Sequence, residues 1–272
     1  MFNYKNSIFL TIAAIVIAVS GCKKNEIITP SYSEFVGATT VSSYFIPNDP
    51  NSTFKIPVGI TNFSDKDRVI NYTVTSPTGA ASGQQYTISG NSITIPAGKV
   101  VDTITVKGLF AGYPAGRKDT LVITLSGGDV PVANYNNVYK VVMQKYCNVN
   151  LTTLLGDYSK SYDLQTGQPT YGPYATKITT PVAITPTKAS IKIENFWDYG
   201  TTITAELDYT DPASFKASIP TQLLYNDPTY GPATIKQVGT GTFSSCDNTF
   251  TFSYTVTVAA GSFGNFTTTI AR

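Results

Sequence analysis

The residues best suited to binding chemistry lie in one short segment, Ile193-Glu194-Asn195-Phe196-Trp197-Asp198-Tyr199-Gly200. The segment holds the only tryptophan of the chain, flanked by an amide, a carboxylate and a tyrosine. An aromatic face can cover the C–H face of a pyranose while amide and carboxylate groups bind its hydroxyls. We therefore predict a sugar-binding role for Trp197, Tyr199, Asp198 and Asn195. The alternative is that Trp197 plugs a hydrophobic core.

A second aromatic set occurs in two similar turn-like sequences. They are Thr170-Tyr171-Gly172-Pro173-Tyr174 and Thr229-Tyr230-Gly231-Pro232. Gly-Pro pairs mark turns, so we expect Tyr171, Tyr174 and Tyr230 to lie on loops. Two similar loops could frame one mouth of a barrel, which makes these tyrosines further candidate ligand-binding residues. The alternative is that both sequences are ordinary turns.

Catalytic chemistry has few candidate residues in this chain. Histidine is absent, which excludes Ser-His-Asp and Cys-His catalysis and every His-ligated metal site. A glycosidase needs two facing carboxylates. The glutamates outside the N-terminal region are Glu194 and Glu206, which could lie on adjacent strands, but a cross-strand or solvated role is favoured for them. We expect a non-catalytic protein with no cofactor and no metal.

Composition indicates a globular protein with little charge. Hydrophobic residues make up 42% and aromatic residues 12% of the 272 residues, enough for a substantial core. Charged residues are only 13%, with a net charge of +2 and no basic cluster. This balance argues against a nucleic-acid partner. Abundant threonine, tyrosine and phenylalanine favour strands.

The N-terminus has the pattern of a secretory signal. Lys5 precedes an apolar run from Ile8 to Val19, which is shorter than the roughly 20 residues of a membrane-spanning helix. The run ends in Val19-Ser20-Gly21-Cys22, which resembles the bacterial lipobox. That resemblance implies removal of residues 1–21, lipidation of Cys22 and a membrane partner reached through the lipid anchor. An ordinary signal peptide is the alternative.

The residues that follow Cys22 carry a second resemblance. No aspartate follows the cysteine directly, which in lipoproteins implies sorting to the outer membrane. Lys24 followed by Glu26 is similar to the surface-export signal of Bacteroidetes lipoproteins, although only one acid follows here. These features predict an outer-membrane protein at the cell surface, with the periplasmic face as the alternative. Residues 22–38 are polar and aperiodic, and we interpret them as a tether.

Residues 39–146 alternate between apolar and polar positions in short segments separated by turns, which predicts a β-sandwich. The expected strands are Thr39–Ile46, Phe54–Ile60, Arg68–Thr75, Gln85–Ile88, Ser92–Ile95, Val101–Val106, Thr120–Leu125 and Val138–Met143. Two consecutive segments resemble a Calx-β-like or Ig-like sandwich. Their sequences are "YTISGNSITIPAGKVVDTITVKGL" and "RKDTLVITLSGG". It also resembles the N-terminal domain of Bacteroidetes surface lipoproteins of the DUF1735 type.

Residues 147–272 predict a lipocalin-like antiparallel β-barrel or a strongly curved meander, so the whole chain is expected to be all-β. A short turn capped by Asn150 should precede the first strand. The expected strands are Tyr158–Leu164, Thr176–Thr185, Ser190–Phe196, Thr202–Asp208, Ala217–Tyr225, Thr234–Val238, Gly241–Ser245, Thr249–Val258 and Asn265–Ile270. The ending of the chain resembles the C-terminal barrel of the same lipoprotein class, in which a final arginine closes the last strand.

Two cysteines remain after Cys22. Cys147 and Cys246 would form a disulfide in an oxidising compartment, and the alternative is a pair of buried free thiols. Calcium-binding members of the Calx-β family carry acids in their loops, whereas this chain has only Asp65, Asp67 and Asp119 there, so we expect no calcium.

A further short motif suggests a modification. Asp102-Thr103-Ile104 and Asp119-Thr120-Leu121 match the O-glycosylation pattern of Bacteroidetes proteins. Thr103 and Thr120 are therefore candidates for glycosylation, although plain strand positions are favoured.

The resemblance and the expected compartment imply a function. A lipoprotein of this class is expected to capture glycan at the cell surface, beside an outer-membrane transporter complex of a polysaccharide-uptake system. One alternative is a structural or adhesive protein that binds another protein through its sheet edges. A weaker alternative is a lipocalin-like carrier of a small ligand inside the barrel.

Overall fold

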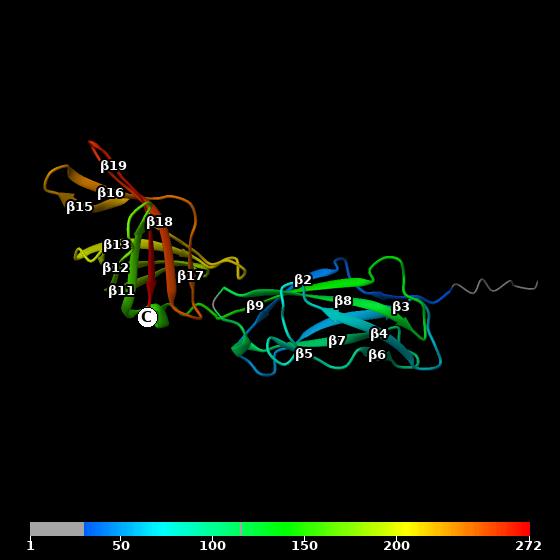
Figure 1. The fold of residues 1–272 in the computed structure, drawn as a ribbon. Coiled ribbons are helices and arrows are strands. Elements are labelled where there is room, and N and C mark those ends of the chain that lie inside the picture. The colour runs from blue at the N-terminus through cyan, green and yellow to red at the C-terminus, as the bar shows by residue number, and fades with distance from the viewer. Residues whose placement is uncertain (1–29, 115) are drawn as a thin grey trace, which may run out of the picture.

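The computed structural model describes residues 30–114 and 116–272, which form two all-β lobes (Figure 1). We call residues 30–146 the sandwich and residues 147–272 the barrel. The expected signal, residues 1–21, and the expected lipidation site, Cys22, lie outside the described residues. Within the described part of the chain, no helix has the length and hydropathy needed to cross a bilayer.

The sandwich consists of two sheets. One sheet has the strand order β1 (Ser33–Phe35), β3 (Phe54–Ile60), β7 (Val101–Gly108) and β5 (Tyr86–Ile88). The other has the order β2 (Val41–Ile46), β9 (Val138–Lys145), β8 (Lys118–Gly128), β4 (Arg68–Thr75) and β6 (Ser92–Ile95). A short 3-10 helix, η1 (Phe110–Gly112), follows β7. The pair β2–β9 is parallel and the other pairs are antiparallel.

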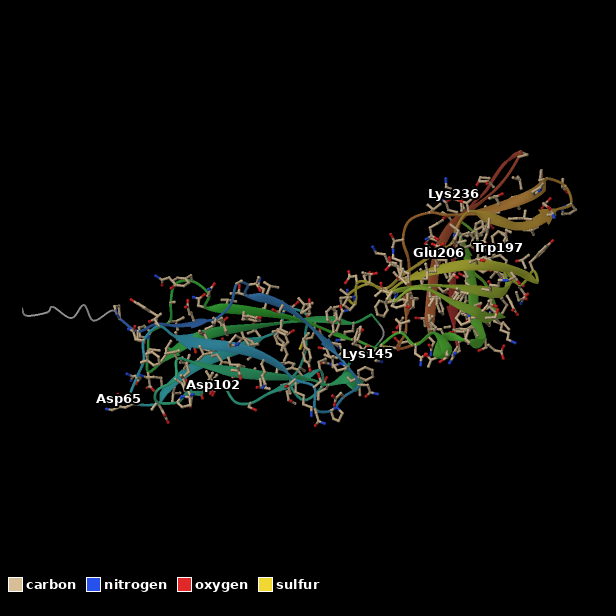
Figure 2. All side chains as sticks on the ribbon, turned by 180° about the vertical axis from the view of Figure 1, so that it is seen from behind. Asp65, Asp102, Lys145, Trp197, Glu206 and Lys236 are labelled. Atoms are coloured by element: carbon tan, nitrogen blue, oxygen red, sulfur yellow. A yellow bond between two sulfur atoms is a disulfide. The ribbon has the colours of Figure 1, made fainter. Side chains whose placement is uncertain are left out.

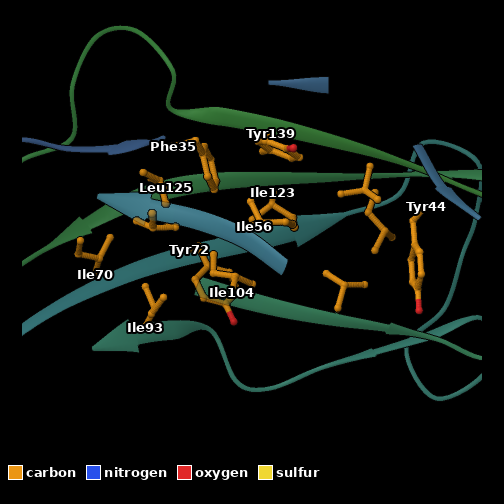
Figure 3. Close-up of a cluster of buried hydrophobic side chains, with 14 of the residues drawn as sticks. Phe35, Tyr44, Ile56, Ile70, Tyr72, Ile93, Ile104, Ile123, Leu125 and Tyr139 are labelled. Atoms are coloured by element: carbon orange, nitrogen blue, oxygen red, sulfur yellow. The ribbon is translucent and has the colours of Figure 1, made fainter. Parts of the chain in front are cut away.

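The core of the sandwich follows from strict alternation along its strands. In β8, Leu121, Ile123 and Leu125 are buried and the residues between them are half-exposed. Figure 3 shows Ile123 and Leu125 packed in one cluster with Phe35, Ile56 and Tyr139 from other strands. Successive side chains of a strand point to opposite faces, so each strand contributes every second residue to this core.

The expected tether is too long at its C-terminal end. Ser33–Phe35, which the sequence analysis places in the tether, is β1 and pairs with β3. Phe35 is only 1% exposed, and its ring lies 5.4 Å from that of Tyr139. A strand of three residues is too short to show a period, so the polar composition around it dominates the prediction.

The barrel is a closed ring of eight antiparallel strands. After the 3-10 turn η2 (Leu151–Leu154), the ring has the order β10, β11, β12, β13, β14, β17, β18, β19, and β18–β19 pairing closes it. The bounds are β10 Gly156–Gln165, β11 Tyr171–Thr185, β12 Lys188–Phe196, β13 Thr201–Asp208, β14 Lys216–Ser218, β17 Gly241–Ser244, β18 Thr249–Val258 and β19 Gly261–Ala271. The predicted all-β fold, a sandwich followed by an antiparallel barrel, is confirmed.

Side chains fill the interior of the barrel. Along β18, Phe250, Phe252, Tyr254 and Val256 are buried and alternate with half-exposed residues. They pack against inward residues of β12 and β13 in one hydrophobic cluster. An eight-stranded barrel is just wide enough for its own side chains to fill it. The described barrel is therefore a packed core, unlike the hollow interior that a lipocalin-like carrier would need.

A hairpin projects from the barrel where the sequence analysis expects one strand. The expected strand Ala217–Tyr225 is divided into β14 and β15 (Gln222–Asp227). Pro220 lies between them and has no N–H to continue a ladder. β15 then pairs with β16 (Gly231–Gln237). β16 in turn pairs with the second half of β18, from Tyr254 to Thr257, while β17 pairs with its first residues, from Thr249 to Thr251.

The two lobes contact each other through the β13–β14 loop. Lys118 Nζ donates to the carbonyl of Ala213 at 2.8 Å, and Gln144 Nε2 donates to that of Pro212 at 3.1 Å. The Tyr146 and Phe215 rings meet at 6.2 Å. Lys145, labelled at this junction in Figure 2, lies 3.7 Å from a carboxylate oxygen of Asp247.

Both ends of the barrel chain are fixed at this junction. Cys147 and Cys246 form a disulfide with a Cα–Cα distance of 5.2 Å, which ties the barrel entry to the β17–β18 turn. The predicted Asn150 cap is confirmed, because its side chain accepts from Thr152 N–H at 3.0 Å. Arg272 donates to the carbonyls of Thr153 and Leu155 and so holds the last strand against η2.

Reduction should destabilise the barrel selectively. The disulfide spans 99 residues, and the chain-entropy model values a loop of that size at about 4–5 kcal/mol. Trp197 is the only tryptophan, so denaturant unfolding followed by its fluorescence reports the barrel alone. We expect the midpoint to fall on reduction, while amide exchange in β8 of the sandwich is unchanged. Equal midpoints with and without reductant would contradict this account.

Candidate functional site

An open cleft of about 380 Å³ lies at one end of the barrel. We call this end the distal mouth, because it carries the β10–β11, β12–β13 and β18–β19 connections and lies away from the sandwich. Figure 2 shows Trp197 there, on the far side of the barrel from Lys145. The cleft is lined by Asp163, Gln165, Gln168, Pro169, Tyr171, Trp197, Asp198, Tyr199 and Phe266. Four of the residues singled out in the sequence analysis, Tyr171, Trp197, Asp198 and Tyr199, therefore meet in one place.

The β12–β13 loop has an unusual backbone. Asn195, Trp197 and Asp198 have φ values of 55°, 63° and 52°. Asparagine and aspartate tolerate this left-handed region, but a bulky residue such as tryptophan adopts it at a cost. Gly200, at φ 66°, completes the turn. The surrounding structure must therefore hold the Trp197 side chain in this position.

Asn195 supplies much of that support. Its side-chain amide donates to the carbonyl of Ala175 at 2.7 Å and to Asp198 Oδ1 at 3.1 Å. Its Oδ1 accepts from Gly200 N–H at 2.9 Å. Asn195 does not line the cleft, so the structure makes it a positioning residue instead of the direct ligand contact expected from the sequence.

Trp197 both lines the cleft and packs on the core. Its ring centroid lies 4.7 Å from that of Phe266, and its Nε1 donates to the hydroxyl of Tyr254. It is half-buried against the hydrophobic cluster of the barrel. The two alternatives for this residue, core packing and cleft surface, thus apply to different parts of one side chain.

The rim of the cleft is aromatic and exposed. Tyr199 is 61% exposed and Tyr171 is 55% exposed, although both are large hydrophobic side chains. The Tyr199 ring rests 5.0 Å from that of Tyr225. The Tyr171 hydroxyl donates to Asp198 Oδ2 at 2.8 Å, which connects the start of β11 to the β12–β13 loop. Exposed aromatic groups held by such contacts form a stable surface for a ligand.

A buried polar chain lies beneath the aromatic surface. The Tyr254 hydroxyl, which accepts from Trp197 Nε1, also bonds Thr268 Oγ1, and Thr268 Oγ1 donates to Asp163 Oδ1. Asp163 is only 9% exposed. Burial raises the pKa of its carboxyl, and hydrogen bonds from Thr268 and Tyr174 oppose the rise. The cleft therefore has a buried carboxylate at its base, stabilised by neutral donors.

The two Tyr-Gly-Pro sequences do not form a pair of loops around one site: the expected loop position is wrong for Tyr171 and Tyr174, which lie on β11, and holds for Tyr230. Tyr174 is 6% exposed, and its hydroxyl accepts from Trp197 N–H at 3.3 Å, so it supports the site from below. Tyr230 lies on the β15–β16 turn, contacts the Phe263 ring at 6.0 Å and does not line the cleft. Neither residue lines this cleft, since Tyr174 is buried within the closed ring and the hairpin that carries Tyr230 projects from the β18 edge.

Several cleft residues are not singled out in the sequence analysis. Asp163 and Gln165 lie on β10, Gln168 on the following turn and Phe266 on β19. Nothing in their local sequence distinguishes them from ordinary strand and turn residues. Only the register that pairs Asp163 with Thr268 brings β10 and β19 together at the mouth.

Other candidate residues lie away from the cleft. Glu194 pairs with Thr202, whereas Glu206 pairs with Ser190, so the two glutamates are separated along the β12–β13 ladder. Asp119 forms an ion pair with Arg117 at 2.8 Å. Asp65 lies at the end of the sandwich remote from Lys145 and the barrel (Figure 2). Asp67 accepts from Ala97 N–H at 2.9 Å.

The two O-glycosylation candidates are strand residues. Thr103 lies on β7 and Thr120 on β8, and both are half-buried. Thr120 N–H donates to Thr78 Oγ1 at 2.9 Å.

Comparisons with known proteins find only distant structural similarity. No family model and no curated protein matches the chain. A multidomain protein including DUF1735 from Bacteroides ovatus is 12% identical, with a TM-score of 0.33 over 88% of this chain and 92% of that one. A candidate carbohydrate-binding protein from Bacteroides ovatus is 12% identical, with a TM-score of 0.35 over 87% of this chain and 69% of that one. A Calx CBD1 domain is 12% identical, with a TM-score of 0.33 over 43% of this chain and 98% of that domain.

Replacing the buried carboxylate should stabilise the fold at neutral pH. Since the pKa of Asp163 is raised above its ordinary 3.8, ionisation costs the folded state more than the unfolded state. That cost is present at neutral pH and disappears as the pH falls through the raised pKa towards 3.8. We expect Asp163→Asn to melt at a higher temperature than wild type at pH 7, with the difference shrinking towards about pH 4.

The exposed Asp157 on the same strand provides the matched control. Asp157→Asn should show no such pH-dependent gain. A lower melting temperature for Asp163→Asn at neutral pH would show that its hydrogen bonds outweigh the cost of burying its charge.

Proposed function

We propose that this chain is a non-catalytic carbohydrate-binding protein that binds sugar in the cleft at the distal mouth. The observation that carries the proposal is the meeting of four aromatic side chains with two carboxylates and two amides in one open cleft. The aromatic residues are Tyr171, Trp197, Tyr199 and Phe266. Aromatic faces match the C–H faces of a pyranose, and carboxylates and amides match its hydroxyls. The volume of about 380 Å³ lies within the size range of small-ligand sites.

The rigidity of the cleft supports this function. Asn195 fixes the β12–β13 loop, and Asp198 links that loop to Tyr171. A surface that is ordered before the ligand arrives loses less entropy on binding. Tyr and Trp are also suited to this role, because they offer large contact areas with few rotatable bonds.

A second cleft, of about 310 Å³, lies between the two lobes and is less suited to a ligand. Its charged groups already have partners in the chain. Lys118 binds a carbonyl of the β13–β14 loop, Arg117 pairs with Asp119, and Lys145 lies beside Asp247. These contacts indicate a junction that holds the lobes together.

The proposal includes a surface location. Lipidation of Cys22 would anchor the chain to the outer membrane, at the cell surface and beside a transporter of a polysaccharide-uptake system. The first described residues lie at the end of the sandwich remote from the barrel (Figure 1). With this arrangement the sandwich spaces the distal mouth away from the anchor, where an extended glycan is accessible.

Truncation of a rim tyrosine should reduce binding without unfolding the barrel. Tyr199 is 61% exposed, so Tyr199→Ala should leave the melting temperature close to that of wild type. In a glycan-array screen followed by calorimetry, we expect affinity for the bound glycan to fall about tenfold, because the substitution removes an aromatic face that contacts the sugar. Trp197 is less suitable for this test, because it also packs on Phe266 and bonds Tyr254.

Tyr135 provides the matched control, since it is 62% exposed but lies on the sandwich. Tyr135→Ala should bind as wild type does. Equal glycan affinity in Tyr199→Ala and Tyr135→Ala would place the site elsewhere.

Removal of the proposed acylation site should release the protein from the membrane. Cys22→Ala leaves no thiol for lipid attachment, so we expect soluble or unprocessed protein in cell fractionation. Ser20→Ala keeps the thiol and a small residue before it, and should fractionate as wild type does. Membrane association of Cys22→Ala at the wild-type level would contradict the proposed anchor.

A further inference from the structure

The cleft at the distal mouth has a distinctive charge. Its nine lining residues include two carboxylates, Asp163 and Asp198, and two amides, Gln165 and Gln168, but no lysine or arginine. The chain as a whole has more basic than acidic residues, with a net charge of +2. The negative character is therefore local to the cleft.

Neither carboxylate has a counter-charge in the described structure. None of the ion pairs found among residues 30–114 and 116–272 includes Asp163 or Asp198. Asp198 accepts from the Tyr171 hydroxyl at 2.8 Å and from the Asn195 amide at 3.1 Å, both neutral donors. Asp163 accepts from the hydroxyls of Thr268 and Tyr174, which are also neutral donors. A buried ionised carboxylate is usually paired with a cation, so its isolation at the base of a cleft needs an explanation.

Asp198 also acts on Asp163. Burial is the main cause that raises the pKa of Asp163, and the charge of Asp198 makes a smaller contribution in the same direction. A positive charge placed between them would relieve both the repulsion and the burial cost. Such a cost persists in a protein when the group serves a function.

We propose that the cleft recognises a sugar that carries a protonated amine, so that the amine supplies the missing positive charge to Asp163 and Asp198. This inference rests on the proposed carbohydrate function and specifies its ligand class, an amino-sugar glycan. The ring of the sugar lies on the aromatic surface of Trp197 and Tyr199. The ammonium group is attracted by the two carboxylates and by the negative faces of the aromatic rings.

The same charges exclude acidic glycans. A uronic acid would bring a third carboxylate into the cleft with no cation to balance it. Like charges that face each other across an interface disfavour binding strongly. Acetylation of the amine would remove the positive charge and leave only the contacts available to a neutral sugar.

The test compares three oligosaccharides of equal length by calorimetry. They are a glucosamine oligomer, its N-acetylated form and a galacturonic acid oligomer, measured at about pH 6, below the pKa of such amines. We expect the glucosamine oligomer to bind about tenfold more tightly than the acetylated form, as for one charge-assisted contact, and the galacturonic acid oligomer to show no binding. Salt at about 1 M, where the Debye length is about 3 Å, should reduce this preference and leave acetylated binding unchanged.

Asp198→Asn keeps the size and an acceptor oxygen but removes one charge. It should lower affinity for the glucosamine oligomer several-fold more than affinity for the acetylated form, so the preference between the two oligomers shrinks. Asp157→Asn is the matched control, because Asp157 is exposed on the same strand as Asp163 and lies six residues away, about 20 Å along β10. It should retain the full preference.

The outcomes separate this inference from the proposed function. Equal affinity for the glucosamine and acetylated oligomers, or binding of the galacturonic acid oligomer, would overturn the amino-sugar assignment while the carbohydrate function stands. Loss of preference in Asp157→Asn as large as in Asp198→Asn would overturn the assigned position of the amine. Absence of binding to all three oligomers and to a glycan array would overturn both proposals.

Discussion

The site depends on closure of the barrel by its last strand. β19 pairs with β18 on one side, from Phe250–Ile270 onward, and with β10 on the other, from Lys160–Ala271 onward. Thr268 therefore lies opposite both Asp163 and Phe252. From that position its hydroxyl bonds Tyr254 and Asp163, the two ends of the polar chain beneath the cleft. An open sheet would separate these groups, and Trp197 would lose its hydrogen-bond partner.

The distal mouth is less favourable for stability than the rest of the barrel. Its loop holds Trp197 at a φ of 63°, and its base contains a carboxylate whose pKa is raised by burial. Strain and buried charge of this kind persist when the surrounding structure holds them in place. Here Asn195 holds the loop, while β18 and β19 hold the carboxylate. The opposite end of the barrel has a disulfide, a capped turn and Arg272 bound to η2, which are stabilising contacts.

Alternation of apolar residues predicts most of this fold. β3, β4, β6 and β18 have the bounds expected from period-2 patterns, because buried residues alternate with more exposed ones over most of each strand. β1 is missed because its three residues carry no period, although Phe35 is central to the sandwich core. The division at Pro220 is missed because the hydrophobic pattern continues across it. The local alternation of apolar and polar residues indicates which residues of a strand are buried. Which strands pair depends on residues that are distant in sequence.

The site is predictable from sequence only in part. Trp197, Asp198 and Tyr199 adjoin one turn, and Tyr171 directly precedes a Gly-Pro pair, so local motifs identify them. Asp163 and Phe266 are about a hundred residues apart and meet only through the β10–β19 register. Tyr174 and Tyr230 share a motif yet differ in burial, because one belongs to the closed ring and the other to the projecting hairpin.

The central claim is that ligand binds against Trp197 at the distal mouth, and the fluorescence of this single tryptophan tests it most directly. A bound sugar ring would replace water over the exposed part of the indole. Titration with a glycan that binds by calorimetry should therefore give a saturable change in emission, with the same dissociation constant as the calorimetric one. Calorimetric binding without any change in Trp197 emission would place the ligand elsewhere on the protein and contradict the account.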